Sequence, residues 1–149
     1  MNALAPLGRL LFSALFIFSG VNHFIQVDTM TPYAQSVGLP AARLAILGSG
    51  ALLVVCGICV LLGAITRLSA ALIALFLVAA ALTMHRFWGL GDPQAAQAQL
   101  GHFMTNISLA GGALLITYFG PGPYSLHARR GGEAPRPGYA FRLRHRAQE

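Results

Sequence analysis

Apolar residues form four long runs along the chain, separated by shorter segments that carry proline, glycine and charged residues. The runs cover about residues 7–25, 44–65, 68–84 and 103–119. The second run has no charged residue over its 22 positions, which exceeds the roughly 20 residues that a helix needs to cross a bilayer. The pattern predicts an all-α fold, a bundle of four transmembrane helices.

The segments between the runs differ in kind. Residues 27–42 include Pro32, Gly38 and Pro40 without sustained periodicity, so we expect a loop there. The second and third runs leave room only for a tight turn, and a polar, Gln-rich linker precedes the fourth. We therefore assign residues 1–128 to one transmembrane domain and residues 129–149 to a basic, flexible tail.

Composition supports a membrane protein. Charged residues make up 9% of the chain and apolar residues 56%, whereas soluble domains carry about 25% charged residues. All ten basic residues are arginines, and six of them lie in residues 129–149. A basic tail beside membrane helices matches anionic lipid headgroups. The net charge of +6 therefore indicates a lipid bilayer as partner and no nucleic acid.

The distribution of arginines predicts the orientation. With both termini in the cytoplasm, the inside holds Arg9, Arg67 and the six tail arginines, and the outside holds only Arg43 and Arg86. Cytoplasmic segments carry the excess of positive charge. No small-x-small cleavage site follows the first run, so we expect a retained helix and not a signal peptide.

A weak internal repeat links the two halves of the chain. Residues 50–54 (GALLV) match residues 112–116 (GALLI), and Gly8-Arg9-Leu10 matches Thr66-Arg67-Leu68. Chance also produces such matches in sequences rich in Ala and Leu. A real duplication would give two pseudo-repeated hairpins related by an axis along the membrane normal. The oligomeric state is left open.

Polar residues gather at the ends of the runs that we place outside. His23, His85 and His102 lie at three such ends, and Asn106 lies one turn deeper than His102 on the same helix face. They form either a pocket whose imidazoles hydrogen-bond a quinone or another small ligand, or interfacial groups that satisfy helix ends. No histidine pair has metal-ligand spacing, so we predict no metal site. The candidate ligand-binding residues are His23, His85, Arg86, Trp88, Asp92, His102 and Asn106.

Three of these candidates also have structural interpretations. Arg86 and Asp92 are six positions apart in one loop, so we expect them to pair as a clamp. Trp88 is expected in an interfacial aromatic belt.

Cys56 and Cys59 form a C-x-x-C motif, which is typical of thiol oxidoreductases. The spacing places both sulfurs on one helix face. Cys56 lies 12 residues into its run, however, about 18 Å from the predicted external end. A soluble thiol partner does not reach that depth, so packing is the competing explanation.

Several of these motifs together resemble the DoxX family of small bacterial and archaeal membrane proteins. The resemblance rests on His85-x-Phe87-Trp88, Asp92-Pro93, the segment from His102 to Gly112, and Ser19-Gly20-Val21-Asn22-His23-Phe24. It covers roughly residues 6–128 and departs from the family at Thr105, where a lysine is common. The resemblance implies four membrane helices and a bacterial cytoplasmic (inner) membrane, and it links the chain to membrane redox complexes such as thiosulfate:quinone oxidoreductase.

Three functional hypotheses follow. The first is a subunit of a membrane redox system, a quinone-linked oxidoreductase, with an external pocket for a quinone or a small ligand. The second is a non-enzymatic membrane anchor or assembly accessory for a redox or biosynthetic partner protein. The third is thiol oxidation through Cys56 and Cys59.

Overall fold

The computed structural model describes residues 3–129, and every regular element in that range is helical. Four helices are long and apolar enough to cross a membrane, which confirms the predicted all-α membrane fold. They are α1 (Leu4–Ile25), α3 (Ala42–Leu62), α4 (Thr66–Met84) and α5 (Pro93–Phe119). Two short helices, α2 (Val27–Ser36) and α6 (Leu126–Arg129), complete the described part. Residues 130–149 of the predicted tail lie outside the described residues.

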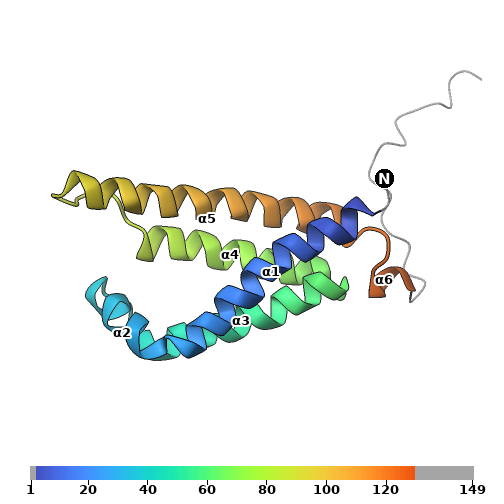
Figure 1. The fold of residues 1–149 in the computed structure, drawn as a ribbon, viewed down its shortest axis with the longest axis horizontal. Helices are drawn as coiled ribbons and strands as arrows, with labels where there is room; N and C mark the ends of the chain where they lie inside the picture. The colour runs from blue at the N-terminus through green and yellow to red at the C-terminus, as the bar shows by residue number, and fades with distance from the viewer. Residues whose placement is uncertain (1–2, 130–149) are drawn as a thin grey trace, which may run out of the picture.

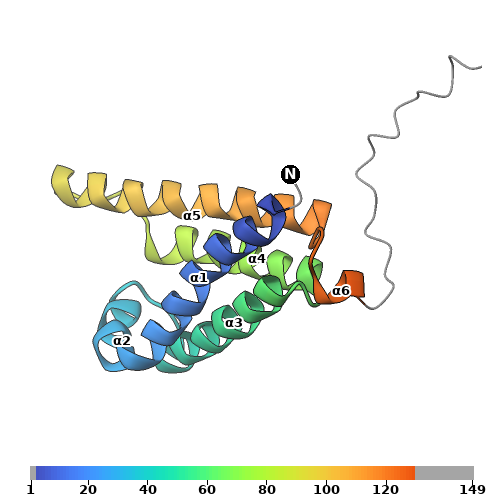
Figure 2. The same cartoon turned by 45° about the vertical axis from the view of Figure 1, so that its right-hand side comes forward.

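The four long helices form two antiparallel hairpins (Figures 1 and 2). In the first hairpin α1 packs along α3, and in the second α4 packs along α5. A short turn after α3 joins the hairpins, with Gly63 and Ile65 both at positive φ. The pairing has the arrangement that a duplicated hairpin would give.

Glycines bring α1 and α3 into close contact. A Cβ built on Gly20 would lie 2.7 Å from the Gly50 carbonyl oxygen, and one on Gly57 would lie 2.8 Å from the side chain of Ile17. The two helices can approach this closely only because glycine has no side chain. In lipid the hydrophobic effect does not drive helices together, so close packing of this kind supplies the attraction between them.

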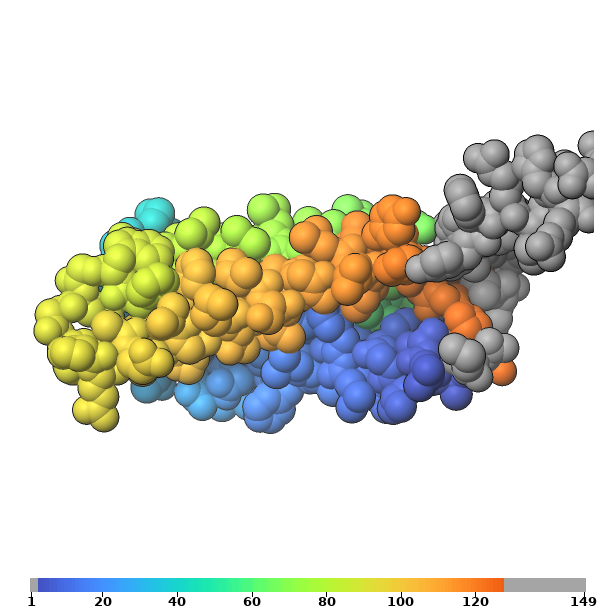
Figure 3. Space-filling view, turned by 90° about the horizontal axis from the view of Figure 1, so that it is seen from above, coloured from blue at the N-terminus to red at the C-terminus, as the bar shows by residue number. Residues whose placement is uncertain are grey.

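The hydrophobic core lies where the two hairpins meet. Phe16 of α1 and Leu53 of α3 pack there with Ile73 and Leu77 of α4. Helix α5 contributes Ala110 and Ala113 as buried residues, and its Leu109 and Ile116 pack against the core while partly exposed. Its opposite face lies on the surface (Figure 3). The second hairpin therefore presents a long, mostly uncovered helix.

The prediction of a loop for residues 27–42 is wrong, because α2 occupies most of that segment. Val27 and Ala34 share one helix face and pack on Ala42 and Ile46 of α3. This burial compensates for the backbone donor that Pro32 removes inside the helix. Helix α2 is thus held by tertiary contacts that no local pattern shows.

The linker expected before the fourth span is also helical. Asp92 caps α5 by accepting a hydrogen bond from the Gln94 N–H at 3.0 Å, and Pro93 occupies the first turn, where its missing donor costs nothing. At 27 residues α5 is about 40 Å long, longer than the hydrocarbon core of roughly 30 Å. Its first turns therefore project past the end of α4 (Figure 1).

One end of the bundle, here called the closed end, is fastened by Arg9. This side chain is only 6% exposed and donates hydrogen bonds to the carbonyl oxygens of Pro121 and Tyr124, each at 2.7 Å. Gly63 leaves space for the guanidinium, since a Cβ there would lie 2.7 Å from Nη1. The start of α1, the turn between hairpins and the segment after α5 thus meet at one point. The first described residues and α6 lie at this same end, and its cytoplasmic location stays a prediction.

Candidate functional site

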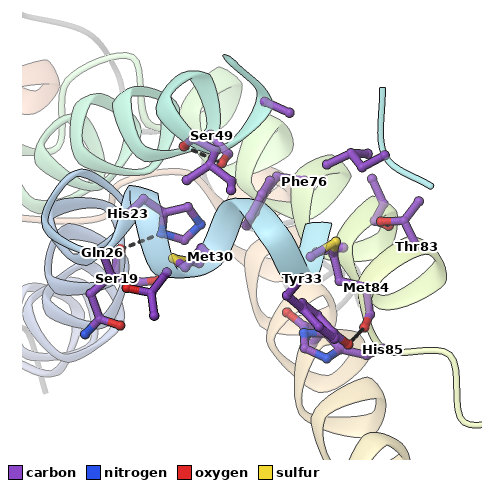
Figure 4. Close-up of a pocket in the computed structure, with 17 residues that line it drawn as sticks. Ser19, His23, Gln26, Met30, Tyr33, Ser49, Phe76, Thr83, Met84 and His85 are labelled. Atoms are coloured by element: carbon purple, nitrogen blue, oxygen red, sulfur yellow. Dashed lines mark hydrogen bonds between the residues drawn. The ribbon is translucent and has the colours of Figure 1, made fainter. Parts of the chain in front are cut away.

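A cavity of about 630 Å³ lies at the opposite end of the bundle, here called the pocket end. Its wall comes mainly from α1, α2, α3 and α4, with Leu39 and His85 from the connections and Asn106 from α5 (Figure 4). Small side chains such as Ala45, Ser49 and Ala80 leave the space open between α3 and α4. The lining is mostly apolar, with polar groups at a few positions, as in ligand sites of this size.

His23 brings the first imidazole to the cavity from α1. The ring is half-buried, and its Nδ1 lies 2.7 Å from the carbonyl oxygen of Ser19, one turn earlier. It meets Phe76 of α4 edge-on, with the ring centroids 6.4 Å apart. A residue of the first hairpin is thus fixed against the second.

His85 brings the second imidazole from the other hairpin. Its Nδ1 lies 3.0 Å from Oε1 of Gln99, whose Nε2 donates to the Tyr33 hydroxyl oxygen at 3.3 Å. The Tyr33 hydroxyl in turn donates to the Met84 carbonyl oxygen at 2.7 Å. This chain of hydrogen bonds ties α2, the end of α4 and the start of α5 together beside the cavity.

The seven candidate ligand-binding residues divide into two groups. His23, His85 and Asn106 line the cavity. His102 is exposed and packs its ring against that of His85, with centroids 5.2 Å apart. The side chains outside the lining are those of His102, Arg86, Trp88 and Asp92.

The expected pair between Arg86 and Asp92 does not form, so that prediction is wrong. Arg86 donates to the carbonyl oxygens of Val37 and Thr83 at 3.2 and 3.3 Å, and Asp92 is used in capping α5. Within residues 3–129 the ion pair at this end joins Arg43 to Asp28. The Arg86 guanidinium therefore bonds to one carbonyl after α2 and one at the end of α4, and not to the carboxylate nearest in sequence.

Trp88 is 50% exposed and packs edge-on against Phe87 and Phe103, with ring centroids 5.1 and 6.0 Å apart. The three rings cover the connection between α4 and α5. Trp88 therefore braces the pocket end from outside the cavity.

Sequence reasoning missed several residues of the site, notably Tyr33, Gln99, Ser19 and Phe76. Ser19 could have been found, because it lies one turn before His23 on the same helix face. The sequence marks Tyr33 only as an expected member of the interfacial aromatic belt and places Gln99 in a polar linker, so neither residue gives a signal for a ligand site.

The cysteines lie apart from the cavity. Cys56 is buried within the core between the hairpins, Cys59 is partly buried, and both are free thiols. Neither lines the cavity. In the described part of the chain, no three His, Cys, Asp or Glu side chains are grouped so that they could hold a metal ion.

Four apolar membrane helices around a small cavity define the chain as a multi-pass membrane protein. The family model named DoxX matches residues 4–86. The chain is 31% identical to the inner membrane protein YphA of Escherichia coli K12, over 83% of this chain and 87% of that protein. It is 30% identical to the uncharacterized membrane protein Rv3486 of Mycobacterium tuberculosis H37Rv, over 81% of this chain and 77% of that protein.

The chain therefore belongs to the DoxX family, and it is a multi-pass protein of the bacterial inner membrane. No solved structure matches it significantly.

Proposed function

We propose that this protein is a subunit of a membrane redox system and that it binds the headgroup of a quinone in the cavity at the pocket end. The observation that carries the proposal is the meeting of His23 and His85, from different hairpins, in one mostly apolar cavity. A quinone headgroup is flat, apolar and polar only at its oxygens, so it needs an apolar slot with a few hydrogen-bonding groups. The predicted topology places this cavity at the external face.

The dimensions agree with such a ligand. Sites for small molecules commonly measure about 300–1,000 Å³, and this cavity measures about 630 Å³. The small side chains of Ser49, Ala79 and Ala80 leave room for a ring, and Met30 and Tyr33 of α2 also line the cavity. Phe76 offers a ring against which a flat headgroup can pack.

The experiment is direct binding of a decyl-substituted benzoquinone, in oxidised and reduced form, to the full chain in lipid nanodiscs. His23→Ala and His85→Ala should each weaken binding of the preferred form about tenfold, the effect of losing one hydrogen bond to a buried group. The matched control is His127→Ala, because His127 is an exposed histidine beyond α5, near the closed end. Absence of binding by either form, or equal binding by all three variants, would refute the proposal.

The anchor hypothesis and the thiol hypothesis make different predictions for the same material. An anchor would keep its partner when both histidines are replaced. A thiol enzyme would lose activity in the double variant Cys56→Ala/Cys59→Ala, which should bind the benzoquinone normally because neither cysteine lines the cavity.

A further inference from the structure

Both histidines that line the cavity use their ring N–H in hydrogen bonds within the protein. His23 is the first case. Its Nδ1 faces the Ser19 carbonyl oxygen at 2.7 Å, and a carbonyl oxygen can only accept. Nδ1 therefore carries the hydrogen in the neutral ring. Nε2 is left with a lone pair, so the ring offers the cavity an acceptor.

The same argument fixes His85 through three linked bonds. The Met84 carbonyl can only accept, so the Tyr33 hydroxyl donates to it and accepts from Gln99. The Gln99 amide must then present its oxygen to His85, which requires the hydrogen on Nδ1 of the imidazole. His85 too is left with an accepting Nε2.

Two hydroxyl groups that line the cavity are also used as donors within the protein. The hydroxyls of Ser49 and Thr83 donate to carbonyl oxygens of their own helices at 2.9 and 2.7 Å. The Asn106 amide nitrogen donates one of its two hydrogens to the His102 carbonyl oxygen at 3.0 Å, which leaves its second N–H as a donor and its amide oxygen as an acceptor. The Ser19 hydroxyl can rotate to serve as donor or acceptor, and Gln26 and Thr29 are mostly exposed at the rim. No carboxylate lines the cavity, so nothing there balances a cationic donor.

We propose that the cavity selects ligands that carry a hydroxyl group, and hence the hydroquinone form over the quinone form. This inference rests on the proposed function and specifies it. A quinone carbonyl brings only lone pairs to a neutral imidazole that also offers a lone pair, whereas a hydroquinone O–H donates to Nε2. Gln99 acts as a positioning residue, because it sets the tautomer of His85 without lining the cavity.

The test compares 4-octylphenol with 4-octylanisole, a pair that differs in one O–H and has no quinone chemistry. The full chain in nanodiscs should bind the phenol about tenfold more tightly, because the ether leaves a buried acceptor unpaired. Gln99→Lys places a donor opposite Nδ1 and should lower this ratio, and in combination with His23→Ala it should bring the ratio close to one, because the His23 acceptor is then also removed. The matched variant Gln99→Glu places an acceptor there and should keep the ratio near ten. Gln99 is half-exposed, so both charges can reach solvent.

A second readout does not depend on any ligand. Nitrogen-15 NMR of labelled histidines distinguishes the two neutral tautomers, and we expect the Nδ1–H form for His85 in the unsubstituted protein and the Nε2–H form in Gln99→Lys. Equal affinities for phenol and anisole, or an Nε2–H tautomer in the unsubstituted protein, would overturn the inference. If the decyl benzoquinone still binds in a histidine-dependent manner, the proposed function survives that outcome. If no quinone form binds, the proposed function fails as well.

Discussion

The two ends of the bundle are built on opposite principles. At the closed end a buried arginine, a glycine at positive φ and a docked segment pack closely against one another. At the pocket end single hydrogen bonds from α2 and the residue after it reach the second hairpin, around an open cavity. The exposed ion pair there joins α2 to α3. At both ends arginines donate to backbone carbonyl oxygens, but the buried one, Arg9, lies at the closed end.

The difference shows how a small bundle can contain a cavity and remain stably folded. Close backbone contact between α1 and α3 holds the first hairpin together, and the shared core and the Arg9 hydrogen bonds join it to the second. The side chains at the pocket end then contribute little to stability and can serve ligand binding. Stability and binding should accordingly be separable by mutation.

The largest expected effect is at Gly63. Gly63→Ala should lower the free energy of unfolding by about 3 kcal/mol, because φ is +72° and the new Cβ would lie 2.4 Å from the Cβ of Ser125. Gly38→Ala is the matched control, with φ of +82° and open space around the new Cβ, and should cost only about 1 kcal/mol. Equal losses in thermal or denaturant unfolding in detergent would show that the closed end is not tightly packed.

A smaller effect is expected at Arg9. Arg9→Met removes the donors to the Pro121 and Tyr124 carbonyl oxygens and should lower the free energy of unfolding by about 2 kcal/mol. Arg43→Met at the pocket end breaks an ion pair whose side chains are 58% and 82% exposed, so its cost should stay below about 1 kcal/mol. A greater loss at Arg43 than at Arg9 would reverse the comparison between the ends.

The smallest effect on stability is expected from filling the cavity. Ala80→Phe should change the free energy of unfolding by less than about 1 kcal/mol, because the cavity offers room for the ring. It should nevertheless weaken binding of the decyl benzoquinone at least about tenfold. Ala95→Phe, on the exposed first turns of α5, is the control and should leave binding unchanged. Normal binding by Ala80→Phe would place the ligand elsewhere.

Part of the site could be predicted from sequence for a physical reason. Polar side chains at the ends of apolar helices must find partners, so His23, His85 and Asn106 could be assigned to one polar face. The chain of hydrogen bonds through Tyr33 and Gln99 could not be predicted. It joins residues 14 and 66 positions apart, and both Tyr33 and Gln99 lie in segments that were expected to lack regular structure. The predicted pair between Arg86 and Asp92 is wrong because residues that are close in sequence within a loop need not be in contact in the folded chain.

The sequence by itself determined the four membrane helices, their order and their tight central turn. Exposing polar groups to lipid costs free energy, so each membrane helix must be a long apolar run that can be recognised from composition and length. The tertiary structure alone decided that residues 27–36 are helical, that Arg9 meets a segment 112 positions away, and that His23 and His85 from the two hairpins line one cavity. Each of these depends on contacts between distant segments, and such contacts have no local pattern in the chain.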